Sequence, residues 1–407
     1  MSTSLLASET TPAGSSDRPL SVAFLVPEDR QTGTYYRFHN FAVALGKLGH
    51  RVTIYSQTNA SRRRTTRETR DGVPYVFAPS VPGNRIVIAP VNPGNVAYRM
   101  FAHVEQADVY HLFQPFPSAA MPWLAMRRRR KGVFAYDWDD FWINEEFGLK
   151  NPHTFNQRWT AFCLRRLERH LPARCPLLTT LSHGLAGLGR RYRSPHIEII
   201  YNGVWPETPP DRDEARRAVG LQPDATYAGL MGWSGEMRWA FDGLRQQMAA
   251  HPKLRLACTG QDPSAVLREF PDVRDRVDCL GFLPGSKMLA YRSALDLGLI
   301  PMAATEFNGY RLPYKLTDFL AAGTPVLASA IGETVELARS LPGITCCEPN
   351  REAWLDNFGR SVAAISGSSR PERIDPSRLL ADFAWMNVTT KLVAAYRSVR
   401  EKILSTP

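Results

Sequence analysis

The sequence contains little cysteine and no long apolar stretch. Its six cysteines in 407 residues form no CxxC pair and no His–Cys pair with metal-ligand spacing, so we expect reduced thiols in a reducing compartment. The longest apolar runs, such as 22–27 and 294–301, are far shorter than the about 20 residues that a membrane-spanning helix needs. These absences exclude a disulfide-stapled scaffold and predict that no segment spans a bilayer.

The composition is that of a globular protein. Hydrophobic residues make up 44% and charged residues 22%, with 28 Gly and 31 Pro, which excludes disordered, collagen-like and coiled-coil classes. The length is two to three times that of an ordinary domain and predicts two domains. Residues 1–18 are rich in Ser, Thr, Ala and Pro and have no basic start, so we interpret them as a disordered leader of a cytoplasmic protein.

The net charge of +11 is concentrated in the first half of the chain. Residues 19–204 hold 25 Lys and Arg against 13 Asp and Glu, whereas residues 205–407 hold 24 of each. Such basic clusters are commonly solvated faces; the alternative is an anionic partner, either a phosphorylated acceptor or the acidic inner face of a membrane. Nucleic acid is the weakest candidate, because the clusters lack interleaved aromatic residues. The clusters are 62–70, 127–131 and 165–169.

Alternating strand and helix patterns predict an α/β fold with two doubly wound Rossmann-like domains that face a central cleft. A strand at 21–26 leads through a polar loop into a helix that Gly49 ends, and a second strand follows. The Pro-rich segment 202–212 interrupts the pattern, which restarts at 225. Ligands of such sheets bind outside the carboxyl ends of the strands. The predicted units are 19–204, 205–384 and a C-terminal helical segment, 385–407, that returns to the first domain.

Several segments in a fixed order carry a resemblance to a known family. They are GTYYRFHNFAVALGKLGHRVTIYS at 33–56, ADVYHLFQP at 107–115, TTLSHGL at 179–185, IIYNGV at 199–204, RLPYKLTDFLAAGTPVLAS at 311–329 and FAWMNVTTKLVAAY at 383–396. The chain thereby resembles a GT-B glycosyltransferase of the retaining "group one" type, glycosyltransferase family four. The resemblance implies transfer of a hexose-type sugar from a nucleotide-sugar donor, held by the second half, to an acceptor held by the first. It implies neither a bound metal nor another cofactor.

Two helix starts are the predicted sites for the donor diphosphate. Gly33 lies between the first strand and its helix, where a missing Cβ lets backbone N–H groups approach an anion. The resemblance implies that this loop touches the donor diphosphate, through Gly33 and through Thr34. In the second half, the backbone N–H groups of Arg311 and Leu312 precede a helix that opens at a proline, and we expect them to point at a phosphate. Lys315 on the first turn either places a cation on the same diphosphate or faces solvent.

The second half also departs from the family pattern. Asp318 occupies the family position whose acid holds the donor ribose hydroxyls, but Tyr310 stands where a first acid is expected, and Glu306 fits that role only if the loop is rearranged. For Tyr310 two interpretations remain: it contacts the donor sugar, or it is a packing residue.

In the family, the first strand of the second half supplies another cation for the diphosphate, through a Gly-Arg pair followed by a lysine. This pattern is also altered here. Gly232 is followed by Trp233, where the family has arginine, and Arg238 stands at the position of its lysine. We expect Arg238 and Lys315 to share the charge of the departing nucleotide. The alternative interpretation is that Arg238 is merely an exposed residue at the start of a helix.

The first half carries an acidic run after its fourth strand. Asp137 stands where the family commonly has histidine, and with Asp139 and Asp140 it is expected to orient sugar hydroxyls. A metal-binding DxD and helix capping are the alternatives. His111 matches a strand-end position on the acceptor side, or is a packed structural histidine. Arg37 either faces the cleft or is a solvated helix residue.

The predicted function is that of a retaining glycosyltransferase that builds a glycan, a glycolipid or a natural product. The substitutions at Tyr310, Trp233 and Asp137 motivate an alternative, a non-catalytic GT-B scaffold or partner protein. An epimerase or a phosphorylase shares the fold and ranks lower. The sugar, the nucleotide base, the acceptor and the oligomeric state leave no signature in the sequence.

Overall fold

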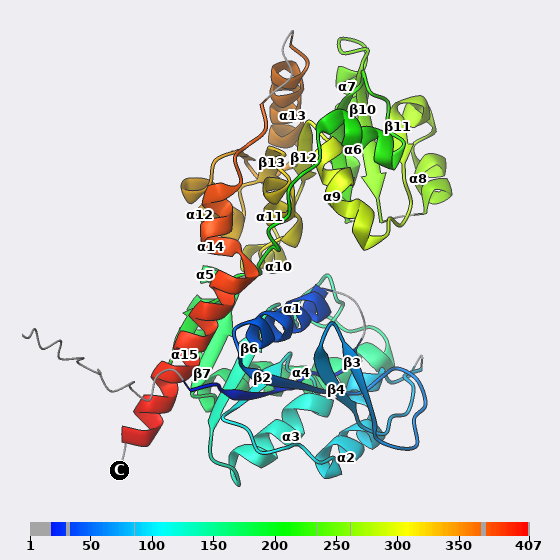
Figure 1. The fold of residues 1–407 in the computed structure, drawn as a ribbon. Helices are drawn as coiled ribbons and strands as arrows, with labels where there is room; N and C mark the ends of the chain where they lie inside the picture. Colours follow the sequence, from blue (N-terminus) through cyan, green and yellow to red (C-terminus); the bar gives the residue numbers. More distant parts are fainter. Residues whose placement is uncertain are drawn as a thin grey trace, which may run out of the picture.

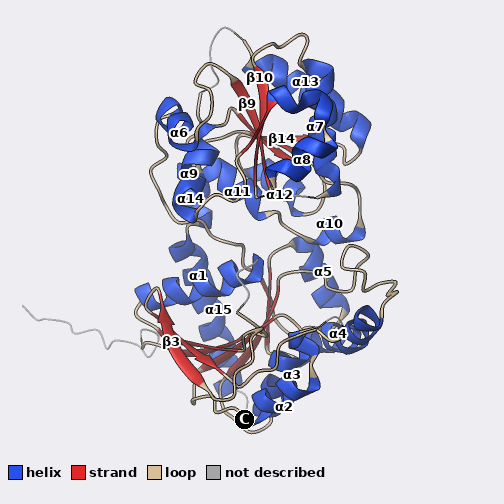
Figure 2. Cartoon of the chain, turned by 90° about the vertical axis from the view of Figure 1, so that its right-hand side faces the viewer, coloured by secondary structure: helices blue, strands red, loops and turns tan. Residues whose placement is uncertain are grey.

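The computed structural model describes residues 18–29, 33–84, 86–232, 234–260, 262–367 and 372–405. The leader residues 1–17 therefore lie outside the described part of the chain. Two α/β domains follow one another along the long axis of the molecule, and one long C-terminal helix runs beside the first domain (Figures 1 and 2). The predicted pair of doubly wound domains is confirmed.

The N-terminal domain is built on a sheet of eight strands in the order β3-β4-β2-β1-β5-β6-β7-β8. All neighbours pair in parallel except β3 and β4, which form an antiparallel hairpin that the sequence analysis missed. Parallel strands need cover on both faces, and β1, β5 and β6 are apolar and buried along almost their whole length. The strands are Ser21–Leu25, Arg51–Ser56, Thr66–Arg70, Val73–Phe77, Val109–Phe113, Val133–Trp138, Leu177–Thr180 and Ile197–Ile199, β1 to β8 in turn.

Helices cover this sheet on both sides. One core forms between the sheet, α1 and the C-terminal helix α15, and another between the sheet, α3, α4 and α5. The helical spacing of Phe38, Phe41 and Leu45 places all three on the buried face of α1, as the sequence predicts. The helices of this domain are α1 (Gly33–Lys47), η2 (Ala89–Val91), α2 (Pro93–Phe101), α3 (Pro117–Arg127), α4 (Phe155–Arg174) and α5 (His183–Arg191).

The C-terminal domain holds a second, wholly parallel sheet in the order β11-β10-β9-β12-β13-β14. Its strands are β9 (Thr226–Met231), β10 (Leu254–Thr259), β11 (Val277–Cys279), β12 (Leu297–Ile300), β13 (Val326–Ser329) and β14 (Ile344–Cys347). Its helices are α6 (Arg212–Val219), η3 (Gly235–Met237), α7 (Arg238–Gln247), α8 (Pro263–Glu269), η4 (Pro271–Arg276), α9 (Gly285–Ala294), α10 (Glu306–Tyr310), α11 (Tyr314–Ala321), α12 (Glu333–Ser340), α13 (Arg351–Ile365) and α14 (Ser377–Phe383).

The chain crosses between the domains twice, and the crossings lie side by side. Val204 and Ala384 form an isolated parallel bridge, in which the Val204 N–H donates to the Phe383 carbonyl at 2.7 Å. Helix α15 (Trp385–Ser405) then packs on α1, where Trp385 meets the ring of Phe41 edge-on at 5.1 Å. The C-terminal helix is therefore part of the core of the N-terminal domain.

Candidate active site

The first turns of α1 lie over the carboxyl ends of β6 and β7. A buried ion pair between Arg37 and Asp137 joins α1 to β6. The Arg37 side chain is completely buried and donates two hydrogen bonds of 2.8 Å to the two carboxylate oxygens of Asp137. It donates further bonds to Asn202 Oδ1 at 2.7 Å and to the Ile200 carbonyl at 2.8 Å. Both expectations for Arg37, a cleft-facing and a solvated residue, are wrong, because a carboxylate at the end of β6 draws its guanidinium inward.

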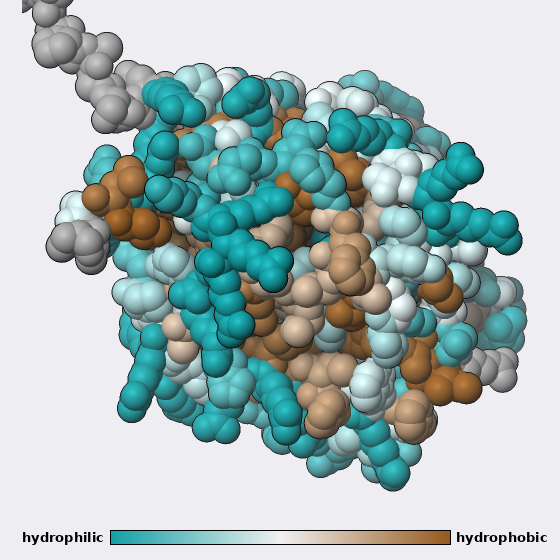
Figure 3. Space-filling model, turned by 90° about the horizontal axis from the view of Figure 1, so that it is seen from below, coloured by the Kyte–Doolittle hydropathy of each residue, from teal (hydrophilic) through white to brown (hydrophobic). Residues whose placement is uncertain are grey.

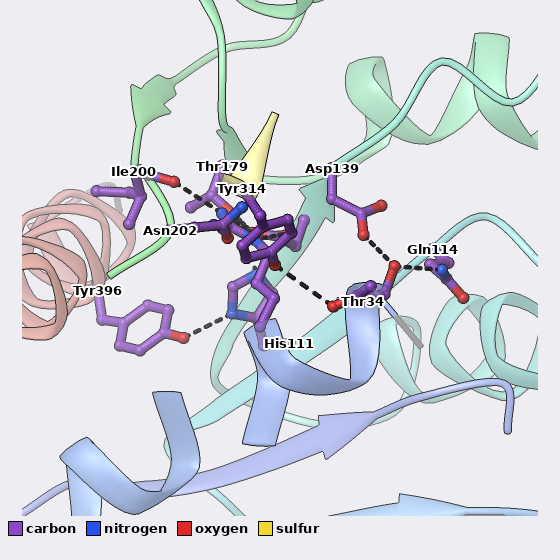
Figure 4. A network of polar contacts seen from close by, with 12 residues as sticks. Thr34, His111, Gln114, Asp139, Thr179, Ile200, Asn202, Tyr314 and Tyr396 are labelled. Carbon is purple, nitrogen blue, oxygen red and sulfur yellow. Dashed lines mark hydrogen bonds and ion pairs between the residues drawn. The ribbon is translucent and has the colours of Figure 1, made fainter. Parts of the chain in front are cut away.

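Asp137 belongs to a buried network that reaches the C-terminal helix (Figure 4). It accepts a hydrogen bond from the Thr179 hydroxyl, which lies 3.2 Å from Nε2 of His111, and Nδ1 of His111 lies 2.6 Å from the Tyr396 hydroxyl. Burial lowers the pKa of His111 to about 4, so the imidazole is neutral at pH 7. Asp137 and His111 are fully buried. Asp137 and His111 can therefore affect a substrate only through the residues that surround them.

A second polar group lies nearer the surface, at the start of α1. The Thr34 hydroxyl donates to Asp139 Oδ2 and accepts from Gln114 Nε2 at 2.6 Å (Figure 4). Asp139 is 4% exposed, and its Oδ1 has no partner among the residues that the structure describes. Burial and the neighbouring charges of Asp140 and Asp137 raise the pKa of Asp139. This group is suited to hold a proton and to bind hydroxyl groups.

Gln114 is a functional candidate that the sequence analysis missed. It follows β5 directly and has a φ of 63°, a left-handed conformation that costs a non-glycine residue energy. Strain of this kind is retained where the surrounding structure fixes it, and here the side chain meets Thr34. No local sequence signal marks such a position, since a glutamine gives no hint of a positive φ.

The helix starts of the two domains meet at this site. The Tyr314 hydroxyl at the first residue of α11 donates to the carbonyl of Gly33, the first residue of α1, at 3.4 Å. Helix α11 is preceded by Pro313, which supplies no side-chain cap to its free N–H groups. Two predicted anion sites, one from each domain, are therefore adjacent.

Lys315 and Gly232 form the cationic part of the site in the C-terminal domain. A Cβ placed on Gly232 would lie 3.3 Å from Lys315 Nζ, and the φ of 69° at this glycine also disfavours a side chain. Burial, and then the positive charge of Arg311, lower the pKa of Lys315 to about 8. No carboxylate of the described ranges forms an ion pair with Lys315. Within the part of the chain that the structure describes, this desolvated ammonium group thus has no counter-ion.

The other donor-side residues lie in different surroundings. Asp318 pairs with Arg292 at 3.3 Å, and burial raises the pKa of its carboxyl group. Arg238, the first residue of α7, is exposed and pairs with Glu269 at 2.8 Å. The side chain of Leu312 is part of the core, which leaves its backbone for any ligand. Trp233 lies outside the described residues.

Tyr310 lies at the contact between the domains. Its ring meets Phe141 of the N-terminal domain edge-on at 5.0 Å, and its carbonyl accepts from the Ser182 hydroxyl. Nearby, Lys150 pairs with Glu306 at 2.9 Å across the same contact. In this arrangement Tyr310 packs, and the carboxylate of Glu306 is engaged by a lysine of the other domain.

Glu333 forms a further link between the domains that the sequence analysis missed. It is 1% exposed and accepts from the backbone N–H of His183 at 2.7 Å and from Nδ1 of His183 at 2.8 Å. It also accepts from the Tyr201 hydroxyl. One buried carboxylate of the C-terminal domain thereby holds the start of α5 in the N-terminal domain.

Two family models match the chain, one for each domain. The model described as Glycosyltransferase Family 4 matches residues 33–208, and the one described as Glycosyl transferases group 1 matches residues 222–362. With the two facing α/β domains, these matches define a class of two-domain transferases. The chain belongs to the group 1 glycosyltransferases of the GT-B fold, as the sequence predicts.

Curated relatives and solved structures agree with this assignment. The D-inositol 3-phosphate glycosyltransferase of Mycobacterium marinum is 27% identical over 216 residues, which are 49% of this chain and 45% of that protein. The matched part thus spans about half the length of that relative. The sucrose-phosphate synthase of Thermosynechococcus elongatus aligns with a TM-score of 0.68 at 15% identity, covering 95% of this chain and 100% of that one. Anabaena HepE in complex with UDP and glucose aligns with a TM-score of 0.59 at 14% identity, covering 95% and 99%.

Proposed function

We propose that this chain is a retaining glycosyltransferase that moves a hexose-type sugar from a nucleoside-diphosphate sugar to an acceptor. The observation that carries the proposal is Lys315, a desolvated lysine with no counter-ion among the described residues, lying against Gly232 at the start of α11. A site built in this way lacks the anion that would balance it. A diphosphate is an anion of the right kind, and Anabaena HepE, which shares the fold, was solved in complex with UDP.

Catalysis in this proposal consists of stabilising the departing nucleotide. Charge develops on the diphosphate as the bond to the sugar breaks, and fixed cations and N–H groups aimed at that position lower the barrier. Lys315 supplies the cation, and the N–H groups before and within the first turn of α11, from Arg311 onward, supply the donors. Arg238 contributes only if its pairing with Glu269 opens, and Asp318 holds the ribose hydroxyls.

The N-terminal domain supplies the groups for sugar hydroxyls. Thr34 donates to Asp139, and the carbonyl of the neighbouring Gly33 accepts from Tyr314 of the C-terminal domain, so these groups lie beside the start of α11. Asp140 follows Asp139 directly in the chain. Retention follows from attack on the face that the diphosphate leaves, with the leaving phosphate accepting the acceptor proton, so that no carboxylate nucleophile is required. Asp137 acts as a positioning residue that holds Arg37 and the end of β6.

The acceptor in this proposal is anionic. A phosphorylated acceptor is favoured because the relative from Mycobacterium marinum is named for an acceptor that carries a phosphate. Neither a metal ion nor another cofactor takes part in the reaction as proposed. Activity that survives a chelator would support this part, and loss that Mg²⁺ or Mn²⁺ restores would contradict it.

The test is transfer from a panel of nucleoside-diphosphate hexoses to phosphorylated and neutral polyols, with the anomeric configuration of the product read by NMR. We expect one nucleotide to be preferred and the product to keep the donor configuration. An inverted product contradicts retention. Absence of both transfer and donor hydrolysis with every donor would favour the non-catalytic scaffold instead.

A further inference from the structure

The end of the N-terminal domain farthest from the other domain carries a large basic hollow. A cavity of about 980 Å³ opens at the amino ends of β1, β2 and β6, where Ser21, Arg51 and Val133 begin their strands. Neighbouring cavities of about 410 and 330 Å³ continue it, and Arg127 lines all three. The candidate active site lies at the carboxyl ends of the same strands, so the hollow is on the opposite side of the sheet.

The charge of this face is strongly one-sided. The linings of the three cavities include ten Lys and Arg side chains and a single carboxylate, Asp108. Asp108 is already engaged, because it pairs with Arg400 at 3.2 Å and accepts two hydrogen bonds from Ser21. Four of the five residues of the basic run 127–131, all except Arg129, therefore line cavities in which Asp108 is the single carboxylate.

Apolar side chains protrude beside these charges. Phe101 at the end of α2 is 91% exposed, Leu404 at the end of α15 is 75% exposed, and Phe162 on α4 is 54% exposed. Met100 and Met121 line the cavity of about 410 Å³. Figure 3, which views the molecule from this end, shows brown and tan areas crossed by long teal side chains.

We propose that this face, formed by α2, α3, α4 and the end of α15, docks on a lipid bilayer that contains anionic lipids. Basic side chains attract acidic headgroups, and protruding Phe, Leu and Met side chains insert among the acyl chains below them. Nucleic acid is the competing partner, because the exposed rings of Phe101 and Phe162 can stack on bases, whereas Leu404, Met100 and Met121 offer no such surface and favour lipid. No helix of the described ranges is both long and apolar enough to cross the membrane, so the contact is peripheral.

The position of the face has a consequence for orientation. Because it lies at the amino ends of the strands, a bilayer on it leaves the candidate active site pointing away from the lipid. Docking therefore holds the protein at the membrane, but it does not bring a short lipid of that bilayer to the candidate active site. The proposal does not depend on the donor, the acceptor or the chemistry of the site.

Co-sedimentation with vesicles tests the proposal. The full chain is mixed with phosphatidylcholine vesicles or with vesicles in which a third of the lipid is phosphatidylglycerol, at low and at high salt. We expect strong binding to the anionic vesicles only, weakened by salt. Binding to neither vesicle contradicts the proposal, and so does retention on nucleic acid without binding to vesicles.

Charge-reversal variants locate the contact. Arg127→Glu with Arg128→Glu is expected to weaken binding to anionic vesicles at least about tenfold, since each basic residue near the surface adds to the attraction for acidic headgroups. Arg63→Glu with Arg64→Glu is the matched control, because it changes the same charge on exposed residues beyond the carboxyl end of β2. Equal loss in the control contradicts a specific face.

A third variant separates insertion from electrostatics. Phe101→Ser with Leu404→Ser leaves the charge unchanged and is expected to remove the part of binding that resists high salt. Both positions are exposed, so the fold tolerates the change, and circular dichroism checks it. Undiminished salt-resistant binding in this variant contradicts insertion of the apolar side chains.

Discussion

Lys315 lies so close to the backbone of Gly232 that a Cβ on the glycine would sit 3.3 Å from Nζ. The two residues are 83 positions apart, at the end of β9 and in the first turn of α11. Their approach creates a small cationic site whose walls are backbone on one side and an ammonium group on the other. The proposed donor diphosphate fits there because nothing else in the described chain balances the lysine.

Replacing Lys315 is expected to damage the reaction and spare the fold. Lys315→Ala should lower kcat/KM with the preferred donor by about 10²- to 10³-fold, on the scale of losing one transition-state donor. Its stability to urea should not fall, because the lysine side chain is desolvated and has no carboxylate partner in the described ranges. Lys287→Ala, an exposed lysine on α9, is the control. Equal kinetics in the two variants would refute the assigned role.

The same lysine predicts a pH dependence of donor binding. With a pKa of about 8 in the free protein, its ammonium form is complete well below pH 8 and is lost as the pH rises through that value. Affinity for the nucleoside diphosphate should therefore fall above pH 8. Lys315→Arg keeps its charge throughout and should flatten the decline, as calorimetry at pH 7 and pH 9 would show. A wild-type affinity that rises with pH would contradict this prediction.

The pair of Arg37 and Asp137 is predicted to support the fold. Asp137→Asn leaves a buried guanidinium without its charge partner and should lower the free energy of unfolding by about 3 to 5 kcal/mol. The double change Arg37→Met with Asp137→Leu removes both charges and should recover much of that loss. Urea titrations measure both. An Asp137→Asn variant of normal stability that has lost activity would instead give Asp137 a direct catalytic role.

Much of the fold was predictable because its signals are local. The apolar strand 21–26 and the helix ended by Gly49 follow from short-range patterns, and the structure confirms them. Strand β3, with the sequence TRETR, is an exposed edge strand, so it shows no apolar pattern to detect. Its pairing with β4 depends on tertiary context.

The site was predictable only where a glycine or a helix start marked it. Gly33 and Lys315 were placed by helix starts and Gly232 by the family resemblance, and the structure brings the last two together. The pairing of Arg37 with Asp137 and the contact of Glu333 with His183 join residues 100 and 150 positions apart. Sequence patterns carry no information on such distances, so these residues were misplaced or missed.

Glu333 is expected to control how firmly the two domains hold together. Glu333→Ala leaves the His183 N–H and the Tyr201 hydroxyl without their acceptor, which should cost about 1 to 3 kcal/mol at this contact. Hydrogen exchange should accelerate at the start of α5 and α12, while the sheets of both domains stay protected. Glu336→Ala, on the exposed side of α12, is the control for the helix itself. Unchanged exchange at α5 would show that the contact does not link the domains.

The most direct test of the central claim is calorimetric titration of UDP, GDP, TDP, ADP and CDP into the wild-type protein and Lys315→Ala. We predict that at least one of them binds the wild-type protein. Its affinity should drop by at least about tenfold in the variant, which corresponds to about 1.4 kcal/mol of lost binding free energy. Failure of all five to bind the wild-type protein, or equal affinity in the variant, would contradict the claim that Lys315 and Gly232 hold the donor diphosphate.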